Sequence, residues 1–143
     1  MGVALLYLVL AASLTAATGP ASLSCTTAPR KEGVLTLRGL IPATQPALEL
    51  TLVEGAGTMT LNADRGDQAR VVEAFGDRVF TLAVTRKEGG EVVLYALPKS
   101  IKVRREPYAV HATFDAVLVR APRPGAATTI TNVHLRCLYD YEV

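Results

Sequence analysis

Hydrophobic residues recur with a period of two along most of this chain, and this spacing constrains the fold more than any other feature. In the final segment VHLRCLYDYEV, residues 133–143, apolar and polar side chains alternate, and only Leu138 breaks the polar set. Successive side chains of a β-strand point to opposite faces, so such alternation predicts a strand that is buried on one face. The same period appears in residues 35–38, 48–52, 58–62, 80–85 and 108–118.

Turn-forming residues separate these segments, because Gly, Pro, Asn and Asp cluster between the apolar runs. After the N-terminal segment, no window of about 11 residues has apolar side chains at helical spacing. Gln68–Ala74 is predicted as a short strand, although it could form one or two helical turns. We therefore predict one all-β domain of about eight strands, an antiparallel β-sandwich with a small β-barrel as the alternative.

The side chains that share the apolar face of each segment are predicted to form a single core. These residues are Leu37, Leu50, Leu52, Leu61, Phe80, Leu82, Val84, Leu94, Val110, Phe114, Leu118, Leu135 and Tyr139.

The last two alternating segments are predicted to pair as a hairpin. Residues directly opposite each other in an antiparallel pair project from the same face. A register with Phe114 opposite Leu135 unites the two apolar faces. The same register places Asp115 opposite His134 on the outer face.

The N-terminal segment, residues 1–21, is predicted to be a cleaved signal peptide. It contains no charged side chain, and its apolar run ends in small residues, which is typical of secretory signals. Cleavage after Ala17 or after Ala21 fits this pattern, and the domain is predicted to span residues 22–143. Two alternatives stay open, namely an uncleaved membrane anchor and lipidation at Cys25. The predicted location is secreted or periplasmic, without stable membrane insertion after cleavage.

The chain has two cysteines, Cys25 and Cys137, which are separated by more than 100 residues. Cysteines of exported proteins usually pair, so we predict a disulfide that ties the start of the domain to its last strand. The CxxC spacing of redox enzymes is absent, and the bond is therefore interpreted as structural.

Charge and aromatic content restrict the class of partner. The net charge of +2 is too small to indicate a polyanionic partner. Only 6% of residues are aromatic and none is Trp, which leaves few side chains that could stack on bases. We predict no nucleic-acid partner and no cofactor. The basic residues that concentrate in one region are Lys99, Lys102, Arg104 and Arg105, and Arg86 and Lys87 could lie near them.

Three polar residues of the last hairpin are candidates for a metal site. His111, Asp115 and His134 could ligate zinc, or act as a base and its orienting partner. A solvated sheet face with a cross-strand ion pair explains the same residues, and we favour this interpretation. The turn Asp64–Asp67 contains the tripeptide read by integrins and resembles a calcium loop, but turns select these residues for backbone reasons.

We predict that the protein is not an enzyme, because no nucleophile with an adjacent base can be assembled from these residues. The favoured function is a non-catalytic secreted binding or structural domain, which contacts an unknown protein or surface partner through its loops or sheet surface. One alternative is a carrier of a small apolar ligand in a cavity between sheets, and a less favoured one is a metal-dependent enzyme. The candidate binding loops are Glu54–Gly57, Asp64–Asp67, Lys87–Gly90 and Pro122–Ala126.

Overall fold

The computed structural model describes residues 20–27, 35–41, 49–54, 57–122 and 131–143, in which ten strands form one antiparallel sheet. The predicted all-β fold is confirmed. The strands are β1 (Ala21–Thr26), β2 (Leu35–Ile41), β3 (Glu49–Glu54), β4 (Gly57–Asn62), β5 (Gln68–Ala74), β6 (Val79–Thr85), β7 (Glu91–Ala96), β8 (Lys102–Glu106), β9 (Ala109–Ala121) and β10 (Thr131–Glu142). The turns include the 3-10 helices η1 (Ala63–Arg65), η2 (Phe75–Asp77) and η3 (Pro98–Ser100).

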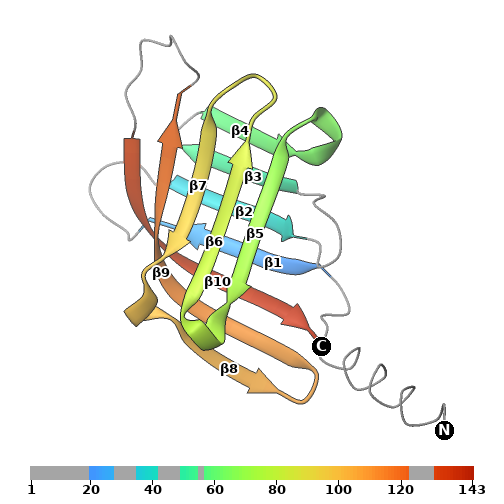
Figure 1. The fold of residues 1–143 in the computed structure, drawn as a ribbon, viewed down its shortest axis with the longest axis vertical. Helices are drawn as coiled ribbons and strands as arrows, with labels where there is room; N and C mark the ends of the chain where they lie inside the picture. Colours follow the sequence, from blue (N-terminus) through green and yellow to red (C-terminus); the bar gives the residue numbers. More distant parts are fainter. Residues whose placement is uncertain (1–19, 28–34, 42–48, 55–56, 123–130) are drawn as a thin grey trace, which may run out of the picture.

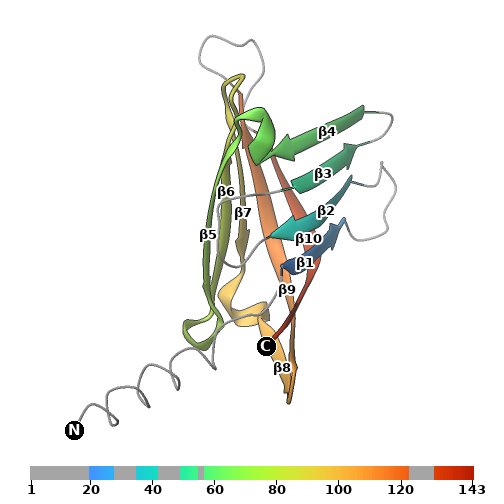
Figure 2. The same cartoon turned by 90° about the vertical axis from the view of Figure 1, so that its right-hand side faces the viewer.

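The sheet curls until its two halves face each other (Figure 1 and Figure 2). The strand order is β4-β3-β2-β1-β10-β9-β7-β6-β5, and β8 pairs with β9 off this path. The long strands β9 and β10 therefore join the half made of β1 to β4 to the half made of β5 to β7. The sheet is nearly closed into a barrel, which matches the barrel alternative more closely than two separate sheets. Its two edge strands, β4 and β5, are connected in sequence through η1.

One edge of β9 is shared by two strands, because β7 pairs with its C-terminal part and β8 with its N-terminal part. Ser100 of η3 bridges the junction between them. Its hydroxyl donates to the carbonyl of Leu97 at 2.7 Å and accepts from the backbone N–H of Asp115 at 2.8 Å. This serine thus satisfies backbone groups at the point where the partner of β9 changes from β8 to β7.

The core between the two halves contains every predicted core side chain except Val110, which is buried but lies outside this cluster. None of these thirteen residues is more than 6% exposed. Aromatic rings fill the end of the core near η2, where Phe75, Phe80, Phe114 and Tyr139 have centroids 4.9–6.3 Å apart. Burial is the main cause that raises the pKa of Tyr139 to about 12. The packed end of the barrel is therefore apolar and aromatic.

The register of the last hairpin differs from the predicted one by two residues. Phe114 lies opposite Cys137, not Leu135, and Asp115 lies opposite Arg136. A shift of two residues keeps every side chain on its face, because side chains alternate with a period of two. The alternation could therefore predict the faces of β9 and β10 correctly and still leave their pairing wrong.

The predicted disulfide between Cys25 and Cys137 is confirmed, with sulfur atoms 2.06 Å apart. The two residues are direct partners on the neighbouring strands β1 and β10, and each is at most 1% exposed. The predicted signal peptide lies outside the described residues except for Pro20 and Ala21, and Ala21 is the first residue of β1. Nowhere in the described residues is there a helix long and apolar enough to cross a membrane.

Candidate functional site

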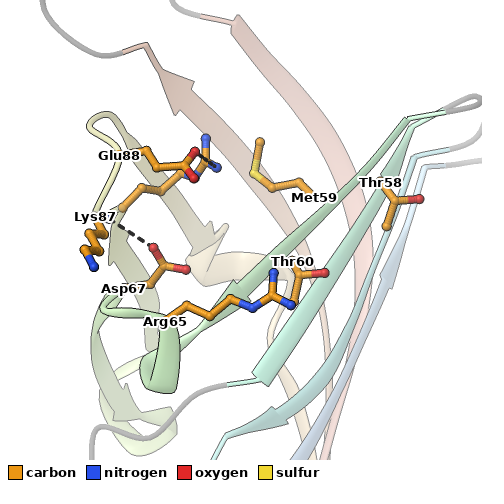
Figure 3. Close-up of a pocket in the computed structure, with 8 residues that line it drawn as sticks. Thr58, Met59, Thr60, Arg65, Asp67, Lys87 and Glu88 are labelled. Atoms are coloured by element: carbon orange, nitrogen blue, oxygen red, sulfur yellow. Dashed lines mark hydrogen bonds and ion pairs between the residues drawn. The ribbon is translucent and has the colours of Figure 1, made fainter.

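Two adjoining pockets lie between β4 and the opposite half of the sheet, and we call them together the mouth. The first has a volume of about 350 Å³ and is bounded by β4, by η1 with the residues after it, and by the loop after β6 (Figure 3). The second has a volume of about 240 Å³ and is bounded by β4, the end of β3 and Arg120 of β9. Both pockets contact Thr58 and Met59, so they form one recess along β4.

Three of the four loops predicted to bind a partner border the mouth. Residues of Glu54–Gly57 line the second pocket, and residues of Asp64–Asp67 and Lys87–Gly90 line the first. The fourth loop, Pro122–Ala126, lies outside the described residues beyond Pro122. Loops distant in sequence therefore meet in one place because the sheet curls.

The mouth is polar because of a change of residue type on several strands. After the last core-facing apolar side chain, the next residue on the same face of the strand is charged. On β6, Phe80, Leu82 and Val84 are buried in the core, and Arg86 follows at the next position of the same parity. The backbone N–H of Arg86 still donates to the carbonyl of Gly90 across the hairpin, at 3.0 Å. Because the strand pairing continues, the arginine side chain enters the first pocket.

The same change from apolar to charged residues occurs on β9 and β3. Leu118 is fully buried, and Arg120 is the next residue of its parity. Leu52 is likewise buried, and Glu54 follows it. Arg120 Nη1 lies 2.6 Å from Glu54 Oε2, which forms an ion pair between β9 and β3, two strands that are not neighbours in the sheet.

Arg86 has an incomplete set of partners among the described residues. Its Nη2 lies 3.3 Å from Glu88 Oε2, but the side chain of Glu88 is 81% exposed. Its Nε is buried and has no hydrogen-bond partner there. A buried donor without a partner loses its hydration without compensation, which costs about 1–3 kcal/mol.

Asp67 fixes the walls of the first pocket. It is 9% exposed, and its two carboxylate oxygens accept from the backbone N–H groups of Asn62 and Lys87, both at 3.0 Å. The Asn62 side chain in turn accepts from the N–H of Asp64 at 2.8 Å. This carboxylate is therefore occupied by backbone donors and positions the turn after β4 against the loop after β6.

Replacing Asp67 with alanine is expected to lower the free energy of unfolding by about 2 kcal/mol, because two partly buried backbone N–H groups lose a charged acceptor. Equilibrium urea denaturation measures the change. Asp64→Ala, at an exposed position of the same turn, is the matched control and should change stability by less than about 0.5 kcal/mol. Equal losses in the two variants would contradict the role of Asp67.

The orientations in Figure 3 separate the residues that face the mouth from those that do not. Met59 points from β4 toward the loop that carries Glu88, whereas Thr58 and Thr60 project on the other side of the strand. Arg65 extends from η1 toward β4, and the amino group of Lys87 points away from the pocket. The mouth therefore combines guanidinium groups with an apolar thioether side chain.

The candidates for a metal site are on the outer face of the last hairpin and do not converge. His134 is exposed and lies opposite Val117, not Asp115. Asp115 accepts from Arg136 Nε at 3.2 Å, and His111 contacts Asp140. In the part of the chain that the structure describes, no three His, Cys, Asp or Glu side chains form a group that could hold a metal ion.

His111 instead belongs to an ion-pair cluster. Its Nδ1 lies 2.6 Å from Asp140 Oδ1, and its Nε2 lies 3.4 Å from Glu106 Oε2. The hydrogen bond to Asp140 is the main cause that raises the pKa of His111 above 6.5, with partial burial opposing it and Glu106 adding to it. This histidine therefore holds its proton more strongly in the folded protein than in the unfolded chain.

A group whose pKa is higher in the folded protein than in the unfolded chain stabilises the fold fully at pH values below its unfolded pKa. This stabilisation is lost as the pH rises through its folded pKa. We therefore expect His111→Gln to reduce the free energy of unfolding more at about pH 5.5 than at about pH 8.5. Urea denaturation at the two pH values measures the difference. His134→Gln is the control, and a His111→Gln effect that is the same at both pH values would contradict the prediction.

The basic residues do not form one patch. Lys102, Arg104 and Arg105 are exposed on β8, which Figure 1 places at the opposite end of the molecule from the β6–β7 loop. The expectation that Arg86 and Lys87 could lie near them is wrong, because these two residues are in that loop. Arg104 also pairs with Glu106 at 3.4 Å, so β8 fits a charged edge strand.

Sequence reasoning missed Arg86 and Arg120 as residues of the site. Their spacing could have identified them. Each arginine lies two residues after a buried apolar residue of the same strand face, Arg86 after Val84 and Arg120 after Leu118. Comparison with models of known protein families, with curated proteins and with solved structures gives no match for this chain.

Proposed function

We propose that this chain is an exported, non-catalytic β-domain that binds a small ligand at the mouth. The observation that carries the proposal is the placement of Arg86 and Arg120, whose side chains are only 27% and 25% exposed, at positions that continue the core-facing series of β6 and β9. Charged groups at such positions cost free energy of desolvation, which a domain selected only for stability would avoid. The mouths of β-barrels are also a common location of ligand sites.

A binding role, not catalysis, is supported by where the reactive side chains are used. Both cysteines are joined in the disulfide, and the hydroxyl of Ser100 bonds to the backbone. His111 is paired on the outer face. The described residues that line the mouth include no histidine, cysteine or serine. Thr58 and Thr60 project on the other side of β4, and Asp67 is occupied by backbone donors, which supports binding over nucleophilic catalysis.

Export is supported by the disulfide, which forms and persists in oxidising compartments, and by the uncharged apolar N-terminal segment. We expect the mature chain to begin at Thr18. Cleavage after Ala21 would remove the first residue of β1, which is 4% exposed and pairs with Ile41. Intact-mass measurement of exported protein checks this, and a chain that starts at Met1 and partitions into detergent would indicate an anchor instead.

The binding proposal is tested by a fragment screen followed by two-dimensional amide NMR on the mature chain. The library should contain anionic, cationic and neutral apolar fragments. We expect hits to shift the resonances of residues 58–60, 65–67 and 86–88 in a saturable way. Shifts confined to the outer face around Ser22, Leu40 and Leu138 would favour a sheet-surface binder, and a screen without hits at the mouth would reject the proposal.

A further inference from the structure

We infer that the mouth recognises the oxyanion group, a phosphate or a carboxylate, of a small amphipathic ligand, with Arg86 and Arg120 as its cationic contacts. This inference rests on the proposed function, because it assigns the chemical class of the ligand for the same site. It depends on three features of the mouth, which are unused guanidinium donors, exposed carboxylates that can be displaced, and an apolar wall.

The first feature is the donor capacity of the two arginines. A guanidinium group has five N–H donors in a planar fork, which matches the paired oxygens of a carboxylate or phosphate. Within the described residues, Arg86 and Arg120 each contact one carboxylate oxygen through one terminal nitrogen. The buried Nε of Arg86 has no partner there. An oxyanion in the first pocket would accept from the terminal N–H groups of Arg86 that Glu88 leaves without a partner, since the buried Nε is not open to the pocket.

The second feature is that the carboxylates paired with these arginines are exposed. The side chains of Glu88 and Glu54 are 81% and 55% exposed, whereas those of Arg86 and Arg120 are only 27% and 25% exposed. Ion pairs between exposed groups contribute little to stability, about 0–1 kcal/mol, and the glutamate is the exposed member of each pair here. A ligand oxyanion can therefore replace either glutamate on its arginine at a small cost.

The charges that line the mouth favour an anion. The described lining residues include four cationic side chains, those of Arg65, Arg86, Lys87 and Arg120, against the three carboxylates of Glu54, Asp67 and Glu88. Both oxygens of Asp67 already accept backbone N–H groups. This balance favours an anionic ligand over a cationic one.

The third feature is the apolar wall. Met59 is partly buried against the core, and Leu52 beside it is 2% exposed. Both side chains line the second pocket, which adjoins the first. A thioether adapts its shape to irregular ligands, and volumes of about 350 and 240 Å³ suit a small molecule. A ligand whose charged group contacts the arginines and whose short apolar part contacts Met59 fits this arrangement.

The test is a titration of the mature chain at constant ionic strength, followed by amide and arginine Nε–H resonances. The probes are butyl phosphate, butyrate, inorganic phosphate and 1-butanol. We expect at least one of the two amphipathic anions to bind saturably at the mouth, and more tightly than either inorganic phosphate or 1-butanol. Whichever of butyl phosphate and butyrate binds more tightly shows whether the mouth prefers a phosphate or a carboxylate.

Matched variants assign the contacts. Arg86→Gln and Arg120→Gln should each weaken binding of the preferred anion at least tenfold. Arg104→Gln, which removes an exposed arginine of β8, should leave it unchanged. Glu88→Gln should tighten binding about threefold, because it removes a competing carboxylate from a side chain that is too exposed to affect folding.

Several outcomes would overturn the inference. If 1-butanol binds at the mouth as tightly as the anions, the site recognises an apolar ligand. If anion binding is insensitive to both arginine variants, the anion binds elsewhere. Either result would leave the proposed binding function standing if other fragments still bind the mouth. Absence of binding by every fragment and probe would reject both the inference and the proposed function.

Discussion

Replacing both Cys25 and Cys137 with alanine is expected to lower the free energy of unfolding by about 4–5 kcal/mol. The bond joins residues 112 positions apart, and a cross-link that closes so long a loop removes much of the conformational entropy of the unfolded chain. It also fastens β1 to β10, the pair through which the β1–β4 half is joined to the rest of the sheet. Guanidinium denaturation of oxidised protein measures the change.

The control for this prediction is reduction of the wild-type protein. A reducing agent should lower the unfolding midpoint of the wild type to approximately that of the double variant, and it should not affect the double variant itself. The double replacement is preferred to single ones, since a single variant leaves one free thiol that forms mixed disulfides once the chain unfolds. A reduced wild type that unfolds at the oxidised midpoint would show that the bond adds no stability.

The faces of the strands could be predicted from the sequence, and their pairing could not. Alternation places Phe114 and Cys137 on the buried face because that property is local to each strand. The partner of Phe114 depends on the register, and a shift of two residues preserves both faces. The loop that sets this register follows Pro122, and its sequence does not impose one tight-turn geometry.

The mouth was harder to predict than the core because it depends on which strands become neighbours in space. The turn residues of Asp64–Asp67 and Lys87–Gly90 predict two candidate binding loops, but the proximity of these loops follows from the curling of the whole sheet. Residue type alone groups Arg86 with the basic residues near Lys102. Its parity with Val84, a local property, would have placed it on the inner side of the sheet.

Gly39 is the position at which we expect a single added methyl group to have the largest effect. A Cβ atom there would lie 1.9 Å from the carbonyl oxygen of Glu49 and 2.8 Å from Cδ2 of Leu50. The first of these atoms belongs to the backbone of β3, which is hydrogen-bonded on both sides, to β2 and to β4. The methyl group can be accommodated only if β2 and β3 move apart.

Gly39→Ala is therefore expected to lower the free energy of unfolding by about 3 kcal/mol, as overpacking of a closely packed interior does. Equilibrium urea denaturation measures it, with Gly76→Ala as the matched control, because no atom lies within 4 Å of a Cβ at that exposed glycine. The control should change stability by less than about 0.5 kcal/mol. A Gly39→Ala variant as stable as the control would mean that β2 and β3 are not as close at this position as the structure places them.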